Sequence, residues 1–272
     1  MTTPSAPRIL LLGGHGRVSL YLTPLLLSRS HPVTSVIRNP QHASEIEAFN
    51  SSASAKAKVD VLVDSLDEVQ DEGDAKRVLE KVKPNWVVWA AGAGGKGGAE
   101  RTEKVDRRAA VAYISAAANT PSITKFLMIS YVASRRGYPS WWNAEDRAAA
   151  DKVNTETLPA YYKAKVAADE HLAAVAKKRG KGFQAINLRP GTLADDEGTG
   201  RVWLGKTSSR GKISREDVAR VAVELLERDD VQGWWDLLQG EDEIKPAVEK
   251  LAKEGWDAMM DGEDLDRIYS VA

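Results

Sequence analysis

Short apolar runs, rich in β-branched or aromatic residues, recur along the chain and are bounded by Gly, Pro, Asn or Asp. Such runs are typical of strands that are buried on both faces of a parallel sheet. The pattern predicts strands at residues 9–12, 33–37, 59–63, 86–90, 126–129, 183–188 and, more weakly, 234–238.

Between these runs, apolar residues repeat at helical spacing. The pattern predicts one helix that opens at Ser214, where Asp217 completes a variant of the capping box, and further helices over residues 18–30, 99–119, 160–179 and 243–254. Residues 43–58, with their Ser/Ala run, are expected to form a mobile loop.

Alternating strands and helices predict the fold class. We expect one α/β domain over residues 1–272, a Rossmann-type doubly wound parallel sheet with helices on both faces. The segments 192–213 and 229–272 are expected to form a small substrate lobe.

The composition excludes several classes of protein. The 272 residues include no Cys, which rules out disulfides, a thiol nucleophile and Cys-ligated zinc. The net charge of -1 gives no reason to expect a nucleic-acid partner, and the four scattered His residues predict no metal site. There is no apolar run of about eighteen residues and no signal-peptide core at the start of the sequence, so we expect a cytoplasmic protein without a membrane partner.

A glycine cluster follows the first predicted strand and precedes a helix. A pyrophosphate needs a turn without obstructing side chains and free N–H groups at a helix N-terminus. This position favours a dinucleotide site over a turn that is only tight. The expected contacts are the consecutive residues Gly13, Gly14, His15, Gly16, Arg17 and Val18.

The end of the second strand discriminates between cofactors. An NAD site carries an acidic residue there, whereas this chain has Arg38, and Arg17 lies in the glycine turn. Two guanidinium groups suit the 2′-phosphate of NADP, so NADP is expected and NAD is less favoured; the alternative is two solvated arginines. Asp64, followed by Ser65, closes the third strand and either accepts from the adenine amino group or caps the next helix.

The chain resembles the short-chain dehydrogenase/reductase superfamily, and more closely its atypical NAD(P)-binding branch of NmrA-like and flavin-reductase-like proteins. The resemblance extends from residue 9 to about residue 254 and includes similar fungal proteins of unassigned activity. It is carried by the glycine turn, by Ala90-Ala91-Gly92, by the 161–169 block, by Leu188-Arg189-Pro190-Gly191 and by the 213–219 block.

The resemblance implies the catalytic groups Ser130, Tyr161 and Lys165, with Asp106 in place of the family's Asn. It also implies that further cofactor contacts are made by Ala90, Ala91, Gly92, Lys165, Pro190, Gly191 and Thr192.

Tyr161 and Lys165 are four residues apart, which places them on one face of a helix. Hydride transfer at a carbon requires proton transfer at the attached oxygen, and a phenol can supply it. We expect the Lys165 ammonium to lower the pKa of Tyr161, and Ser130 to hold the carbonyl. The alternative is that the two residues share this spacing by chance.

These features predict an NADP-dependent oxidoreductase that acts on a small carbonyl or alcohol. Two alternatives stay open, an NADP-binding sensor of the NmrA-like kind without turnover and an epimerase or dehydratase. The helices 99–119 and 160–179 are candidates for a homodimer contact.

Two segments near the site have open interpretations. Trp141 and Trp142 either pack under a loop or form a lid over an apolar substrate. The glycine-rich residues 92–98 are expected to form a flexible rim near the cofactor.

Overall fold

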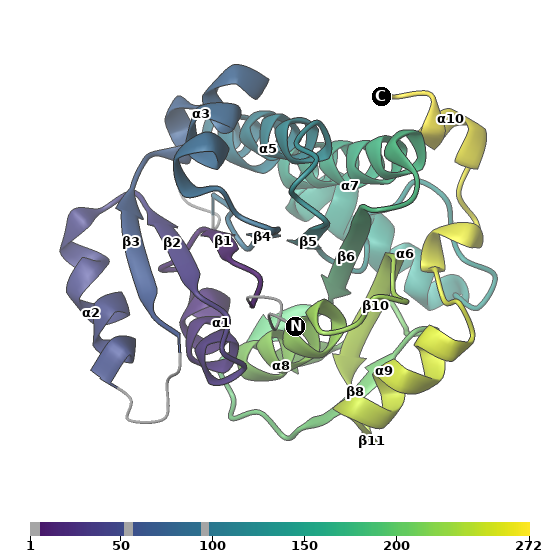
Figure 1. Cartoon of the computed structure of the whole chain (residues 1–272). Coiled ribbons are helices and arrows are strands. Elements are labelled where there is room, and N and C mark those ends of the chain that lie inside the picture. The colour runs from purple at the N-terminus through teal and green to yellow at the C-terminus, as the bar shows by residue number, and fades with distance from the viewer. Residues whose placement is uncertain (1–5, 52–56, 94–97) are drawn as a thin grey trace.

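The structure is a computed structural model that describes residues 6–51, 57–93 and 98–272. Within these residues, one nine-stranded sheet has the order β11-β8-β10-β6-β5-β4-β1-β2-β3 (Figure 1). Its strands are β1 (Ile9–Leu12), β2 (Val33–Ile37), β3 (Val59–Val63), β4 (Trp86–Trp89), β5 (Lys125–Ile129), β6 (Gln184–Pro190), β8 (Arg201–Leu204), β10 (Gly233–Gln239) and β11 (Asp242–Glu243).

The six strands from β3 to β6 are parallel and follow the strand order of a dinucleotide-binding sheet. Strand β10 extends this sheet in parallel to β6, whereas β8 and β11 are antiparallel to their neighbours. Strands β7 (Thr192–Ala194) and β9 (Lys212–Ser214) form a separate pair. The predicted fold class is confirmed, and each of the predicted strands is present.

Helices cover both faces of the sheet (Figure 1). One face carries α1 (Arg17–Ser28) and α8 (Arg215–Leu226), and the other carries α3 (Glu72–Val82), α5 (Ala110–Ala118) and α7 (Pro159–Arg179). The two cores follow from the alternation of side chains along β1, because Ile9 and Leu11 belong to the α1/α8 core while Leu10 and Leu12 belong to the other.

The predicted helix over residues 99–119 is interrupted by a wider turn. It comprises α4 (Gly98–Thr102), a π-helical segment (Glu103–Ala109) and α5. Such π segments are often found at functional sites. This one carries Asp106, a buried carboxylate that is only 1% exposed.

The structure corrects the expected loop over residues 43–58. Residues 43–51 form α2 (Ala43–Glu47) and a short 3-10 segment (Ala48–Ser51), because Ile46 is fully buried against the sheet. Residues 52–56 lie outside the described part of the chain.

Besides α2, three helices of the described residues were not among those predicted. Asp71 caps α3 with hydrogen bonds from the N–H groups of Gly73 and Asp74. Helix α6 (Ala144–Lys152) begins with a capping box between Asn143 and Asp146. After α9 (Ile244–Lys253), the chain ends in α10 (Leu265–Tyr269), which lies beside α7 (Figure 1).

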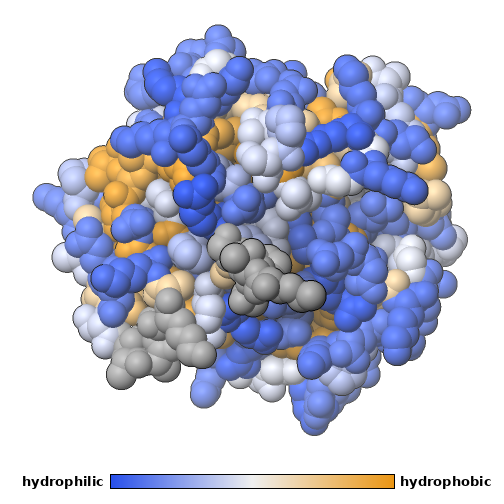
Figure 2. Space-filling model, in the orientation of Figure 1, coloured by the Kyte–Doolittle hydropathy of each residue, from blue (hydrophilic) through white to orange (hydrophobic). Residues whose placement is uncertain are grey.

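The surface in the same orientation is largely hydrophilic, with an apolar area over the region of β3 (Figure 2). Val63 of that edge strand is 49% exposed. No helix in the described ranges is long and apolar enough to cross a membrane.

Candidate functional site

The turn after β1 forms a cradle of backbone groups. Gly13 has φ +85°, and a Cβ there would lie 2.6 Å from the Cα of Ala91, so only glycine fits. The Ser19 hydroxyl donates to the Gly13 carbonyl at 2.8 Å and fixes the turn against α1. Gly16 precedes α1, and within the described residues no side chain caps its first N–H groups. These groups are therefore available to an anion at the helix N-terminus.

The cradle opens into a cavity of about 250 Å³ at the carboxyl ends of β1 to β4. This is the edge at which open α/β sheets bind ligands. The cavity brings together the predicted residues Gly13, Gly14, His15, Gly16, Arg38, Asp64, Ala90, Ala91 and Gly92. Of the glycine-rich rim, residues 94–97 lie outside the described chain.

The other predicted cofactor residues lie outside this lining. Arg17 pairs with Asp195 at 2.6 Å, and Asp195 also pairs with Arg215, so the expected pair of Arg17 and Arg38 is not formed at the cavity. Val18 is buried in the α1 core, and Ser65 donates its N–H to the carboxylate of Asp64 at 2.8 Å.

The residues predicted for the nicotinamide end form a packed turn. Pro190 ends β6, and a Cβ on Gly191 would lie 2.3 Å from Leu238. Thr192 donates its N–H to the carbonyl of Gly211 at 2.9 Å. The turn lies at the carboxyl edge of the sheet, but it does not reach the cavity formed by β1 to β4.

The cavity contains a second arginine, Arg101, that the sequence did not predict. Arg38 donates to one oxygen of Asp67 at 2.8 Å, and Arg101 donates to the other at 2.9 Å. Although burial alone would raise it, these two hydrogen bonds hold the pKa of Asp67 below its usual value. Asp67 and Arg101 are 34 residues apart, so no local sequence motif predicts that they form a pair.

The predicted catalytic residues meet where β5 ends. Tyr161, Lys165 and Asp169 follow each other at intervals of four on α7. Lys165 is 1% exposed and donates to the carbonyl of Ile129 at 2.9 Å. Ser130 donates its hydroxyl to Asp169 at 2.6 Å.

Asp169 was not predicted, although it lies one turn beyond Lys165. One of its oxygens accepts from both Ser130 and Ser134, each at 2.6 Å. Burial raises the pKa of Asp169, while the charge of Lys165 opposes this shift. The signal that could have identified it is the continued spacing of four within the 161–169 block.

Burial raises the pKa of Tyr161, and the nearby carboxylates of Asp106 and Asp169 raise it further. The pKa of Tyr161 is thus raised, contrary to the expectation that Lys165 lowers it. Asp106 accepts the N–H of Ala93 at 2.9 Å, and burial raises its pKa as well, against the charge of Lys165. The Tyr161 phenol consequently keeps its proton at neutral pH.

Trp141 and Trp142 pack against the segment around Thr207, which agrees with the interpretation that they pack under a loop. Both indole N–H groups, of Trp141 and Trp142, donate to the carbonyl of Thr207 at 3.0 Å, and Trp142 is only 2% exposed. The guanidinium of Arg135 lies 5.0 Å from the Trp142 ring. In the described residues, no group of His, Asp and Glu side chains could hold a metal ion.

Three similar proteins place this geometry in context. The UPF0659 protein C216.03 of Schizosaccharomyces pombe is 31% identical over 214 residues, which cover 78% of this chain and 81% of that protein. A solved structure from Bacillus halodurans, named as a candidate NAD-dependent epimerase/dehydratase, is 27% identical with a TM-score of 0.71, covering 90% of this chain and all of that one. The oxidoreductase ylbE from Lactococcus lactis shares the fold, with 22% identity, a TM-score of 0.68 and coverage of 90% and 97%.

The family model described as NAD(P)H-binding matches residues 13–229, which begin in the glycine cradle and include both the cavity and the residues of the Tyr161 cluster. The strand order, the cradle and this match agree on one assignment. The chain belongs to the NAD(P)H-binding family, with the fold of NAD(P)-dependent oxidoreductases and epimerases.

Proposed function

We propose that this protein is an NADP-dependent oxidoreductase that reduces a small carbonyl compound. The observation that carries the proposal is the position of Lys165 and Ser130 at the end of β5, two strands away from the glycine cradle in the sheet. Tyr161 lies one turn before Lys165 on α7, with its ring 5.2 Å from that of Tyr131, just after β5. Nucleotide binding and proton transfer thus have separate groups at one edge of one sheet.

The residues of the cavity fit a dinucleotide. The α1 N-terminus supplies N–H groups for the pyrophosphate, and Asp64 lines the region beyond the second strand where the adenosine would lie. Arg38 and Arg101 already hold one carboxylate, that of Asp67, between them. A 2′-phosphate carries more charge and suits the same guanidinium groups, so it competes well for them.

When bound, the nicotinamide supplies the hydride. The Tyr161 phenol would give its proton to the carbonyl oxygen as negative charge develops there. The phenol is in its acid form at neutral pH, as a proton donor must be. Lys165 would hold the ribose and stabilise the phenolate that results, and Ser130 would orient the carbonyl by its hydroxyl.

The first test removes only the hydroxyl of Tyr161. We expect Tyr161→Phe to lower kcat for NADPH-dependent carbonyl reduction by about 10²–10⁴-fold, with little change in nucleotide affinity. Tyr162→Phe is the matched control, because in the described part of the chain its hydroxyl makes one hydrogen bond, to the backbone carbonyl of Arg135 at 3.3 Å. Near-parent turnover in Tyr161→Phe would refute the assignment.

The second test concerns the cofactor. NADPH should bind more tightly than NADH, and Arg38→Ala should weaken NADPH binding by about ten- to a hundredfold, since a hydrogen bond to a charged group contributes about 1.5–3 kcal/mol. Arg17→Ala serves as the control and should change affinity little, because Arg17 pairs with Asp195 outside the cavity. Equal affinities for NADPH and NADH, measured by fluorescence titration, would refute the proposed specificity for NADP.

Epimerisation is a second candidate, favoured by the name of the Bacillus halodurans relative. An epimerase returns the hydride to its substrate, so sugar-nucleotide turnover without net NADPH consumption would support it. Binding of NADPH without turnover of any carbonyl, alcohol or sugar nucleotide would instead favour a sensor.

A further inference from the structure

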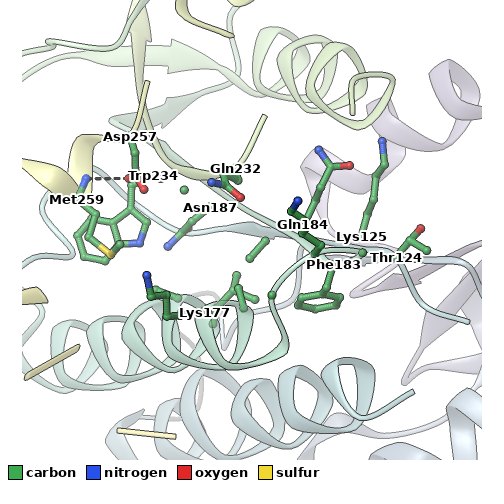
Figure 3. Close-up of a pocket in the computed structure, with 18 of the residues that line it drawn as sticks. Thr124, Lys125, Lys177, Phe183, Gln184, Asn187, Gln232, Trp234, Asp257 and Met259 are labelled. Atoms are coloured by element: carbon green, nitrogen blue, oxygen red, sulfur yellow. Dashed lines mark hydrogen bonds between the residues drawn. The ribbon is translucent and has the colours of Figure 1, made fainter. Parts of the chain in front are cut away.

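A second pocket lies at the opposite edge of the sheet from the nucleotide cavity. It has a volume of about 820 Å³ and is bounded by the amino ends of β5, β6 and β10, by α7 and by the segment that leads to α10 (Figure 3). Its rim carries exposed residues such as Lys177 and Gln232, and its inner end carries the buried residues Asn187, Trp234 and Asp169. None of these residues belongs to the cofactor cavity.

The inner end holds polar groups that the fold leaves unused. Asn187 is 2% exposed, and neither its amide oxygen nor its amide nitrogen has a hydrogen-bond partner within the described chain. The Oδ1 atom of Asp169, which is fully buried, also has no partner there. Buried polar groups are nearly always paired in folded proteins, because an unpaired one destabilises the fold.

Figure 3 shows Asn187 extending from β6 into the space towards the helix that carries Lys177, with the indole of Trp234 beside it. Asn187 and Trp234 are paired in register on neighbouring strands, so both side chains project from the same face of the sheet. Rotation of the Asn187 amide towards the open part of the pocket breaks no hydrogen bond with the described residues, because it makes none.

From this arrangement we propose that the pocket binds a small uncharged aromatic carboxamide. A primary amide can accept from the nitrogen of the rotated Asn187 side chain and donate to its oxygen, so it matches both unpaired atoms of that amide. Trp234 and Leu172 supply buried apolar surface for the ring.

The site also borders the catalytic cluster. Asp169 Oδ2 accepts from Ser130, and Oδ1 of the same carboxylate is one of the unpaired atoms. A carboxamide at the inner end of the pocket therefore shares a residue with the proposed reaction site without occupying the nucleotide cavity.

Benzamide is the probe, and benzoate is its matched control, because benzoate lacks the N–H donors and adds a charge. In the nucleotide-free protein, benzamide titrated into ¹⁵N-labelled sample should shift the resonances of the Trp234 indole and of Gly182 at the pocket rim. A dissociation constant in the millimolar range is expected for so small a ligand, on the order of 1 mM. Benzoate should leave these resonances unchanged, and equal shifts with both compounds would overturn the proposal.

Asn187→Leu removes the hydrogen-bonding groups at nearly the same size. We expect it to weaken benzamide binding at least about tenfold and to raise the melting temperature by about 2–4 °C, because an unpaired amide is replaced by an apolar group. Asn154→Leu is the matched control: that amide is paired with Tyr131 and Ala133, both at 2.8 Å, so its loss should lower the melting temperature and leave benzamide binding intact.

Undiminished benzamide binding in Asn187→Leu, or a melting temperature that falls as in Asn154→Leu, would overturn the proposal. Ala173→Leu gives a second measurement if Asn187→Leu fails to fold, since Ala173 lines the pocket on α7 and a larger side chain there should exclude benzamide. These readouts do not involve NADPH or turnover, so their outcome is independent of the proposed reductase activity.

Discussion

At the residue scale, the pKa of Tyr161 is set by its neighbours rather than by the Tyr-x-x-x-Lys spacing alone. Burial favours the neutral phenol, and two carboxylates on different helical segments add to this effect. The positive charge of Lys165 acts on both Asp106 and Asp169, because it opposes the rise in pKa that burial causes in each of them. Its positive charge is therefore already shared before any substrate binds.

This arrangement predicts the effect of restoring the family's asparagine. Asp106→Asn keeps an oxygen that can accept from Ala93 but removes a negative charge near Tyr161. The phenolate becomes less unfavourable, so the pKa of Tyr161 should fall. In the alcohol-oxidation direction, which needs the phenolate, the rising limb of the pH–rate profile should move to lower pH.

Asp60→Asn, on the exposed side of β3, is the control and should leave that limb in place. A limb at unchanged or higher pH in Asp106→Asn would contradict the electrostatic assignment.

At the scale of the elements, local patterns predicted most of the strands and helices. The run at residues 9–12 becomes β1, and Ser214 caps α8 by accepting from the N–H of Asp217 as expected. Helix α3 carried the same kind of local signal, with Asp71 as its cap and apolar residues at helical spacing, and was missed in spite of it.

The site was less predictable because its contacts join distant parts of the chain. The cradle is contiguous in sequence and was found, but the pairing of Arg101 with Asp67 depends on where α4 lies relative to β3. Arg17 was misplaced for the same reason, since its partner Asp195 is 178 residues away. The spacing of residues along one helix or strand cannot predict contacts between residues that are far apart in the sequence.

The turn between β1 and α1 gives a prediction at this scale. Gly13→Ala should abolish measurable NADPH binding and destabilise the fold, because a Cβ at position 13 meets backbone atoms of Ala91 at 2.6 and 2.7 Å. We expect a loss of about 1–2 kcal/mol from the left-handed conformation and about 1–3 kcal/mol more from the overlap. Urea unfolding and fluorescence titration measure the two effects.

Gly255→Ala separates the two contributions, because Gly255 has φ +63° and, apart from its chain neighbours, no atom of the described structure lies within 4 Å of the added Cβ. It should lose only the conformational part and keep parent affinity for NADPH. Equal destabilisation in both variants would show that the approach to Ala91 is unimportant.

At the scale of the whole molecule, a buried charge cluster connects the sheet with the segment after β5. Asp236 of β10 is fully buried and pairs with Arg189 of β6 at 2.8 Å and with Arg135 at 3.0 Å. The Arg189 guanidinium also lies 4.0 Å from the Trp234 ring. Burial lowers the pKa of Arg135 to about 10, so this guanidinium stays charged at neutral pH.

Asp236→Ala should therefore destabilise the protein by about 3–5 kcal/mol, because it leaves two buried positive charges without their carboxylate. Asp230→Ala, which removes the partner of Arg228 at the surface, should cost less than about 1 kcal/mol. Urea unfolding of both variants checks this difference. A small loss in Asp236→Ala would mean that the cluster contributes little to the fold.

Helix α7 imposes a limit on how this chain can change in length. It runs without interruption from Pro159 to Arg179 and carries Tyr161 and Lys165 near its start and the wall of the second pocket near its end. One inserted residue turns everything beyond it by about 100° and advances it by about 1.5 Å. An insertion or deletion between Lys165 and Ala173 would thus put the two sites out of register even if the helix formed normally. Length variation in relatives that keep both sites is expected in the loops on either side of α7 and not within it.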